Sequence, residues 1–167
     1  PLWSYNTGED VLWSIAISAD GEYIAAGSWD WKVYLFDKDS STPLWSYSTG
    51  DNVYSVAISA DGEYIAAGSY DDKVYFLPRN KTDFDWSYTT GGDVYSIDIS
   101  ADGEYIVAGT GSDDDKVYLF DKDSSTPLWD ASAGEDVAIS ADGEYIAAVS
   151  GNKVYLFDKN IPPTATI

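Results

Sequence analysis

The residues of this sequence with the clearest chemical potential are its carboxylates, of which there are 29 against nine basic side chains. Several lie close together in expected turns, where clustered oxygen ligands could bind calcium. These candidate ligands are Asp113, Asp114, Asp115, Asp37, Asp39, Asp121 and Asp123. No turn has the full alternating-Asp pattern with a distant Glu, so the competing interpretation is solvated carboxylates that keep edge strands from aggregating.

A second set of carboxylates belongs to the hexapeptide Ser-Ala-Asp-Gly-Glu-Tyr, which occurs four times. A catalytic pair needs two carboxylates in unlike environments, with their pKa values pushed apart. Four equivalent copies indicate turn chemistry instead. Cysteine and histidine are absent, which excludes a thiolate nucleophile, a disulfide and an imidazole base. We therefore predict that the protein is not an enzyme, with a carboxylate-dependent hydrolase or lyase as a remote alternative and no cofactor.

Two further features suggest recognition rather than catalysis. Trp13, Trp29 and Trp31 concentrate indoles in the first part of the chain. Exposed indoles can stack on sugar rings or anchor a protein partner, although packing against each other or a neighbouring chain is the favoured interpretation. Asn80 begins an Asn-Lys-Thr sequon, which predicts a surface glycosylation site if the protein is secreted.

The elements that position these residues are repeated. The Asp of the hexapeptide recurs at spacings of 41, 41 and 40 residues, and a Lys-Val-Tyr marker recurs with it. Within the second copy, residues 53–59, 64–69 and 73–77 are β-branched, aromatic or small, and a fourth strand is expected around Trp86. The Asp61-Gly62 pair between the first two runs is a hairpin signal. Four short antiparallel strands in each of four repeats predict a β-propeller with four blades.

The stretch VYSVAISADGEYIAAGSYDDKVYFL, residues 53–77, resembles a WD-repeat blade. Residues 33–47, VYLFDKDSSTPLWSY, are more similar to a quinoprotein-type blade with its docking tryptophan. The resemblance covers residues 1–160 and implies a propeller fold without implying one activity, because propellers serve as enzymes, scaffolds and adhesins. The chain lacks the His of the WD-repeat pattern and has no quinone-binding constellation.

Strand order predicts how the ring is closed. Residues 1–6 match the fourth strand of a blade, whereas the last repeat supplies only three strands. We expect the N-terminal strand to complete the last blade of a four-bladed ring. An eight-bladed ring formed by a homodimer and a fragment of a longer ring are the alternatives. Residues 161–167, rich in Pro and Thr, predict a linker to a following domain and resemble such junctions in large cell-surface proteins.

Charge sets the expected partners and location. The net charge of −20 repels phosphate backbones, so nucleic acid is not an expected partner, and no segment is long and apolar enough for membrane insertion. We predict a structural, adhesion or assembly module of an extracellular or cell-surface protein that binds protein partners or neighbouring copies. The alternative is a propeller that binds glycans or calcium.

Overall fold

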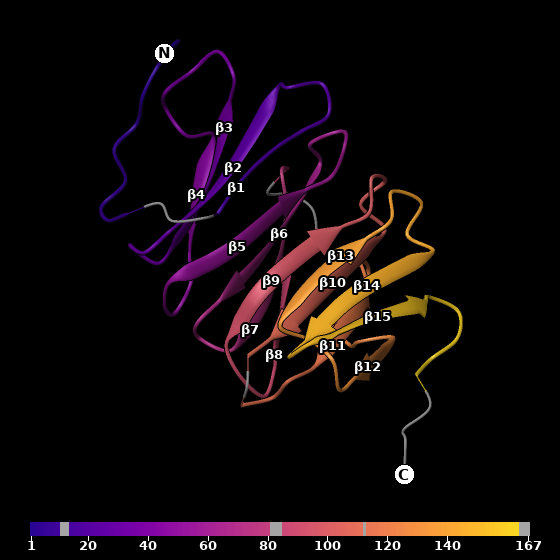
Figure 1. Ribbon diagram of the computed structural model, residues 1–167. Coiled ribbons are helices and arrows are strands. Elements are labelled where there is room, and N and C mark those ends of the chain that lie inside the picture. The colour runs from indigo at the N-terminus through magenta and orange to yellow at the C-terminus, as the bar shows by residue number, and fades with distance from the viewer. Residues whose placement is uncertain (11–13, 81–84, 112, 164–167) are drawn as a thin grey trace.

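The computed structural model describes residues 1–10, 14–80, 85–111 and 113–163, and these contain fifteen strands and no helix (Figure 1). The first eight strands are β1 (Ile15–Ile17), β2 (Tyr23–Ser28), β3 (Lys32–Asp37), β4 (Trp45–Ser48), β5 (Val53–Ile58), β6 (Tyr64–Ser69), β7 (Lys73–Pro78) and β8 (Trp86–Thr89). The other seven are β9 (Val94–Ile99), β10 (Tyr105–Thr110), β11 (Val117–Asp121), β12 (Trp129–Ala131), β13 (Asp136–Ile139), β14 (Tyr145–Ser150) and β15 (Lys153–Asp158).

The strands form four antiparallel sheets, which we call blades 1 to 4 in chain order. Blades 1, 2 and 3 have four strands each in sequence order, and blade 4 has the three strands β13-β14-β15. Each blade begins with the hairpin of the repeated hexapeptide. Gly62, for example, has φ of +70°, a conformation that glycine adopts without steric penalty. The sequence therefore predicted the blade and its first turn correctly.

Adjacent blades pack face to face and bury a hydrophobic layer between them. Between blades 1 and 2, the side chains of Val33 and Leu35 are fully buried against Val53 and Leu77. The small residues of the second strand allow this close approach. A Cβ added to Gly68 would lie 2.5 Å from Cγ1 of Val94 in blade 3. Glycine at that place therefore sets the spacing between the two sheets.

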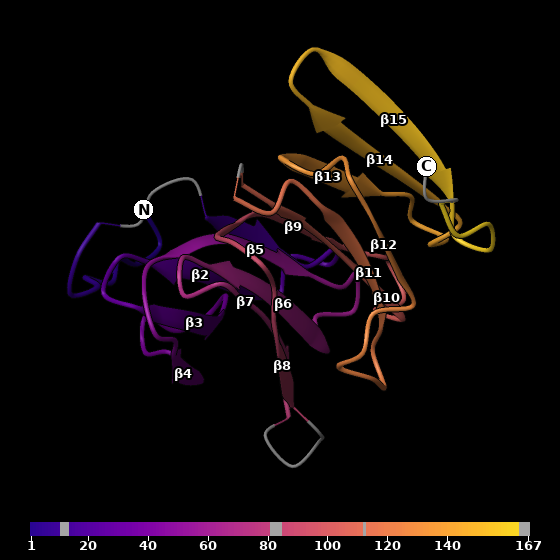
Figure 2. The same cartoon turned by 90° about the horizontal axis from the view of Figure 1, so that it is seen from below.

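The blades fan out as an arc, with the first strand of each blade next to the first strand of the following one (Figure 2). The expected closure of the ring by the N-terminal strand is not formed in this structure. Residues 1–6 pair with no strand within the described ranges and lie at one end of the arc, whereas β15 is at the other end (Figures 1 and 2). The N-terminal segment packs on blade 1 instead, because Trp3 contacts Phe36 with ring centroids 5.4 Å apart.

Blade 4 is the shortened blade, as its sequence indicates. Strand β13 has four residues where β5 and β9 have six. Its β14–β15 turn has two residues, since Ser150 pairs with Lys153, whereas in blade 1 three residues separate the pair Ser28 and Lys32. Residues 161–163 follow β15 without joining a strand, and residues 164–167 lie outside the described ranges, so the linker remains a prediction.

Candidate interaction surfaces

The repeated hexapeptide is a hydrogen-bonded turn. In blade 1 the Asp20 carboxylate accepts hydrogen bonds from the Ser18 hydroxyl at 2.6 Å and from the Glu22 backbone N–H at 3.0 Å. These two bonds lower the pKa of Asp20. The same serine and backbone contacts recur in the other three blades. In every copy the same oxygen of the Asp carboxylate accepts both hydrogen bonds, which agrees with a structural role of this Asp in the turn.

The glutamate of the hexapeptide pairs with the base that follows the third strand of its own blade. Lys159 lies 2.8 Å from Glu144 and 4.1 Å from the ring centroid of Tyr105 in the preceding blade. Arg79 pairs with Glu63 and lies over the ring of Tyr23 in the same manner. These glutamates therefore orient cations that connect neighbouring blades.

In blades 1 to 3, a second network ties the turn between the second and third strands to the third strand and to the segment before the first strand. The Asp71 carboxylate accepts hydrogen bonds from the Tyr75 hydroxyl at 2.5 Å and from the Gly50 N–H at 2.7 Å. Burial and the hydrogen bond to Asp71 raise the pKa of Tyr75. Asp30 and Asp114 make equivalent bonds in blades 1 and 3. This Asp–Tyr pair provides an internal network without the histidine of the WD-repeat pattern.

The four repeated tryptophans connect consecutive blades. The indole N–H of Trp45, on blade 1, donates a hydrogen bond to the carbonyl oxygen of Arg79 in blade 2 at 3.0 Å. The equivalent bonds join Trp86 to Lys122, Trp129 to Lys159 and Trp3 to Lys38. Trp45, Trp86 and Trp129 thus belong to fourth strands and dock on the following blade. Trp3 docks in this way although its segment is in no sheet.

A further cluster of aromatic rings is formed by three tyrosines on blades 2 and 3. Tyr54 stacks on Tyr70 with centroids 4.3 Å apart, and the ring of Tyr95 stands edge-on to both at 5.5 Å. Tyr95 is exposed, and the other two are half-buried. Burial, together with hydrogen bonds to Tyr54 and Tyr95, raises the pKa of Tyr70. We call these three residues the tyrosine cluster.

Carboxylates lie close in sequence to the tyrosine cluster. Asp93 precedes Tyr95 by two residues, and burial together with the charges of Asp72 and Asp113 raises the pKa of Asp93. Asp93 therefore lies among other carboxylates. Sequence reasoning missed this cluster, although the spacing contained a signal: Trp13 and Trp29 lie one repeat before Tyr54 and Tyr70.

The tryptophans singled out from the sequence have different surroundings. Trp31 is exposed, with φ of +66°, and its carbonyl oxygen accepts the N–H of Thr49. Trp29 is half-buried, with its indole nitrogen enclosed. Trp13 lies outside the described residues. Their role in binding a ligand or partner remains a prediction.

The candidate calcium ligands take part in local hydrogen bonds. Asp114 accepts the Tyr118 hydroxyl, and Asp115 accepts the Ser150 hydroxyl at 2.9 Å. The carboxylates of Asp37 and Asp121 accept the N–H groups of Asp39 and Asp123, whereas Asp113 is exposed. No group of three or more metal-ligating side chains occurs in the part of the chain that the structure describes. The calcium hypothesis therefore gains no support from the geometry.

Two remaining sequence features concern the surface. Asn80 is exposed, and the rest of its sequon, residues 81 and 82, lies outside the described ranges, so its glycosylation stays a prediction. In those ranges no helix has the length and apolar character that a membrane crossing requires.

Comparison with known proteins agrees with the blade geometry. Residues 1–37, 41–76 and 84–121 each match the WD domain, G-beta repeat family (WD40). Each match begins with a tryptophan segment and continues through three strands of the next blade. No curated protein matches the chain significantly. The three matched repeats cover well over half of the sequence, and the chain therefore belongs to the WD40 repeat family.

Proposed function

We propose that the chain is a non-enzymatic protein-interaction and assembly module, and that the tyrosine cluster is a surface on which it binds a partner. WD40 repeats indicate a protein-interaction or scaffold module. The observation that carries the proposal is the stack of Tyr54 on Tyr70 with the exposed Tyr95 beside it. Tyrosine rings supply large and rigid contact area with little conformational entropy to lose.

The partner that fits this surface is a cationic protein segment. Asp93 is two residues before Tyr95, the charges of Asp72 and Asp113 act on it, and the net charge of the chain is −20. Arginine and lysine side chains can pair with such carboxylates while resting on the faces of tyrosine rings. We further propose that the module acts in adhesion or assembly at a cell surface, where a strongly acidic exterior keeps it soluble.

Calorimetric titration with an arginine- and lysine-rich octapeptide tests the binding surface. We expect the wild-type chain to bind, and the Tyr95→Ala variant to bind at least tenfold more weakly. Leu44→Ala is the control, because Leu44 is an exposed apolar residue on blade 1 outside the cluster. Equal affinity of the wild type and Tyr95→Ala would refute the proposed surface.

The same titration with a neutral glucan hexasaccharide separates protein recognition from the glycan alternative. We expect no heat of binding with the sugar. Binding of the hexasaccharide that is lost in Tyr95→Ala would assign the tyrosine cluster to carbohydrate recognition instead.

A further inference from the structure

The arc of blades exposes one half of a blade interface at each of its two ends. At the interior interface, Val33 and Leu35 of β3 are fully buried by blade 2. Blade 4 repeats the same Lys-Val-Tyr-Leu-Phe sequence in β15, where Val154 and Leu156 are 79% and 72% exposed. Because the residue types are the same, the difference in exposed fraction arises from blade 2, which covers Val33 and Leu35. Blade 4 presents an apolar face that a further blade would bury.

The other half of this interface is on blade 1. Val56 of β5 is 8% exposed because blade 1 covers it, whereas Ile15, one repeat earlier in β1, is 70% exposed. Ile17 beside it is 60% exposed. Contiguous exposed apolar surface of this kind marks an interaction site. The chain thus carries both complementary faces of one unformed blade interface, on opposite ends of the arc (Figure 2).

The N-terminal segment has the position of a fourth strand contributed by a preceding blade. Trp3 donates its indole hydrogen bond to blade 1 as Trp45 does to blade 2. The Gly8 N–H reaches Asp30 at 3.0 Å, as the Gly50 N–H reaches its own Asp in blade 2. Two contacts that a fourth strand makes with the following blade are therefore present. Its pairing with a third strand is the part that remains unformed.

The missing third-strand partner matches the free edge of β15. In the described sheet β13-β14-β15, strand β15 is an edge strand. A groove of about 850 Å³ runs beside it, lined by residues 155–158 of β15 and by residues 130–132 and 161–163. An edge of unpaired backbone groups is a template for a strand from another chain.

We propose that two copies of this chain join head to tail into an eight-bladed ring, in which the N-terminal segment of each copy forms the fourth strand of blade 4 in the other. The blade 4 end of each copy meets the blade 1 end of the other, and the ring closes because this contact occurs twice around a two-fold axis. Each closing interface buries the face of Val154 and Leu156 against the face of Ile15 and Ile17. The inference goes beyond the proposed function and does not depend on the tyrosine cluster.

Closure of a single copy on itself is disfavoured by the interfaces already formed. The four blades form an arc whose two ends do not meet (Figure 2). A four-bladed ring needs twice the rotation per blade of an eight-bladed ring, so its closure would require the buried contacts of Val33 and Leu35 to repack.

The molar mass in solution is the first test. Light scattering should give twice the 18.2 kDa of one chain for the wild type. Leu156→Asp should reduce the mass to that of one chain, since a carboxylate would have to be buried at the closing interface. Leu44→Asp is the matched control, because Leu44 is an exposed leucine between β3 and β4 and is not among the residues of either end face, and it should leave the mass at two chains. A wild-type mass of one chain, or of more than two, would overturn the ring.

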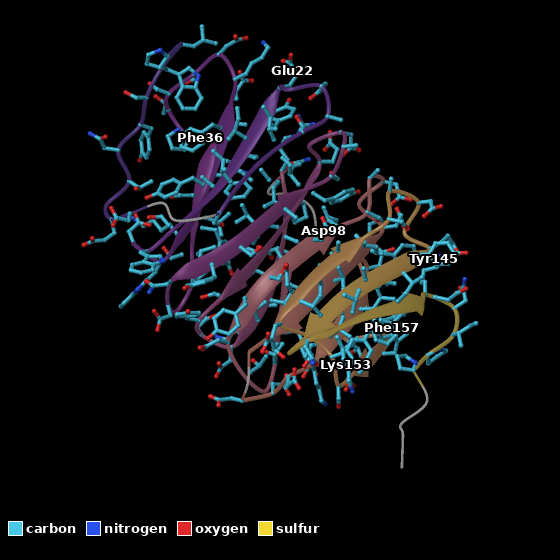
Figure 3. All side chains as sticks on the ribbon, viewed as in Figure 1. Glu22, Phe36, Asp98, Tyr145, Lys153 and Phe157 are labelled. Carbon is cyan, nitrogen blue, oxygen red and sulfur yellow. The ribbon has the colours of Figure 1, made fainter. Side chains whose placement is uncertain are left out.

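Introduced cysteines test the register of the exchanged strand, since the chain has none of its own. Lys32 lies opposite Ser48 in the β3–β4 pair. The same register in the proposed ring places Asn6 of one copy opposite Lys153 of the other. Within one copy, Trp3 contacts Phe36, and Figure 3 shows Lys153 far from Phe36. Cross-strand neighbours are close enough for a disulfide.

Mixing the Asn6→Cys chain with the Lys153→Cys chain under oxidation should therefore give a disulfide-linked pair that contains one chain of each kind. Either chain oxidised alone provides the control for random collision. Lack of the mixed pair, with an internal disulfide in the Asn6→Cys/Lys153→Cys double variant, would show that each chain closes on itself and would overturn the proposal.

Discussion

The carboxylate of Asp98 accepts a hydrogen bond from the backbone N–H of Ile139, 2.9 Å away across the boundary between blades 3 and 4. The same carboxylate accepts the N–H of Ile99. Blade 2 has Ala57 at the corresponding place, so this bridge is particular to the shortened last blade. Asp98 lies near the middle of the molecule, and its burial raises its pKa (Figure 3).

Removal of this bridge should loosen blade 4. We expect Asp98→Ala to lower the free energy of unfolding by about 1–3 kcal/mol, because the Ile139 N–H then loses its acceptor within a packed interface. Urea denaturation measures the loss, and hydrogen exchange should speed up at Ile139 more than in blade 2. Asp39→Ala, at an exposed carboxylate, should change neither value. Unaltered exchange at Ile139 in Asp98→Ala would contradict the bridging role.

The raised pKa of Asp98 has a consequence for acid stability. A carboxyl group whose pKa is higher in the folded than in the unfolded protein takes up a proton on folding between the two values. Its contribution to stability therefore increases as the pH falls from above the folded pKa towards 3.8, the ordinary value. Asp98→Asn cannot titrate, so the stability of the wild type relative to this variant should increase over that acidic range and be constant at higher pH. Urea midpoints of both proteins from pH 7 to pH 4 measure it, and a difference that moves the opposite way would exclude this linkage.

The hydroxyl of Tyr75 should stabilise blade 2 measurably. Its bond to the Asp71 carboxylate is a hydrogen bond to a charged acceptor, so Tyr75→Phe should cost about 2 kcal/mol of unfolding free energy. Tyr155→Phe is the matched control, since Gly151 stands four residues before Tyr155 where blade 2 has Asp71. Thermal or urea denaturation should show that the control variant has nearly the same free energy of unfolding as the wild type. Equal losses in both variants would mean that ring packing, and not the carboxylate bond, determines the effect.

The sequence predicted those parts of the structure that depend on local chemistry. Gly62 requires positive φ and marks the hairpin, and Gly68 is small because the next sheet approaches it. The curvature of the arc could not be predicted, because small rotations at three blade interfaces add up and depend on detailed side-chain packing. The hydrogen bond between Asp71 and Tyr75, which takes the place of a histidine network, could not be predicted either, because the sequence does not show which residue of the turn faces the third strand. The tyrosine cluster was missed because Tyr in a strand is more often part of the core.

The glycine at the blade interface should be intolerant of a side chain. In Gly68→Ala the new Cβ would lie 2.5 Å from Cγ1 and 3.2 Å from the carbonyl oxygen of Val94, so neighbouring strands must separate. We expect a loss of about 1–3 kcal/mol from overpacking. Val149→Ala changes the equivalent position of blade 4, where a side chain is already present, and should lose less. Chemical denaturation measures the free energy of unfolding of both variants. An unchanged value in Gly68→Ala would show that the two sheets can separate at this position without loss of stability.

Added salt should stabilise the protein at neutral pH. Twenty-nine carboxylates against nine basic residues give a net charge of −20, so the folded state carries strong self-repulsion that salt screens. Salt also weakens the ion pairs, but most of these involve partly exposed side chains, and such pairs contribute little. The melting temperature should therefore rise between low and near-physiological ionic strength. The same titration near pH 4 is the internal control, because fewer carboxylates are then ionised and the rise should shrink. A melting temperature that falls with salt at pH 7 would mean that the ion pairs outweigh the repulsion.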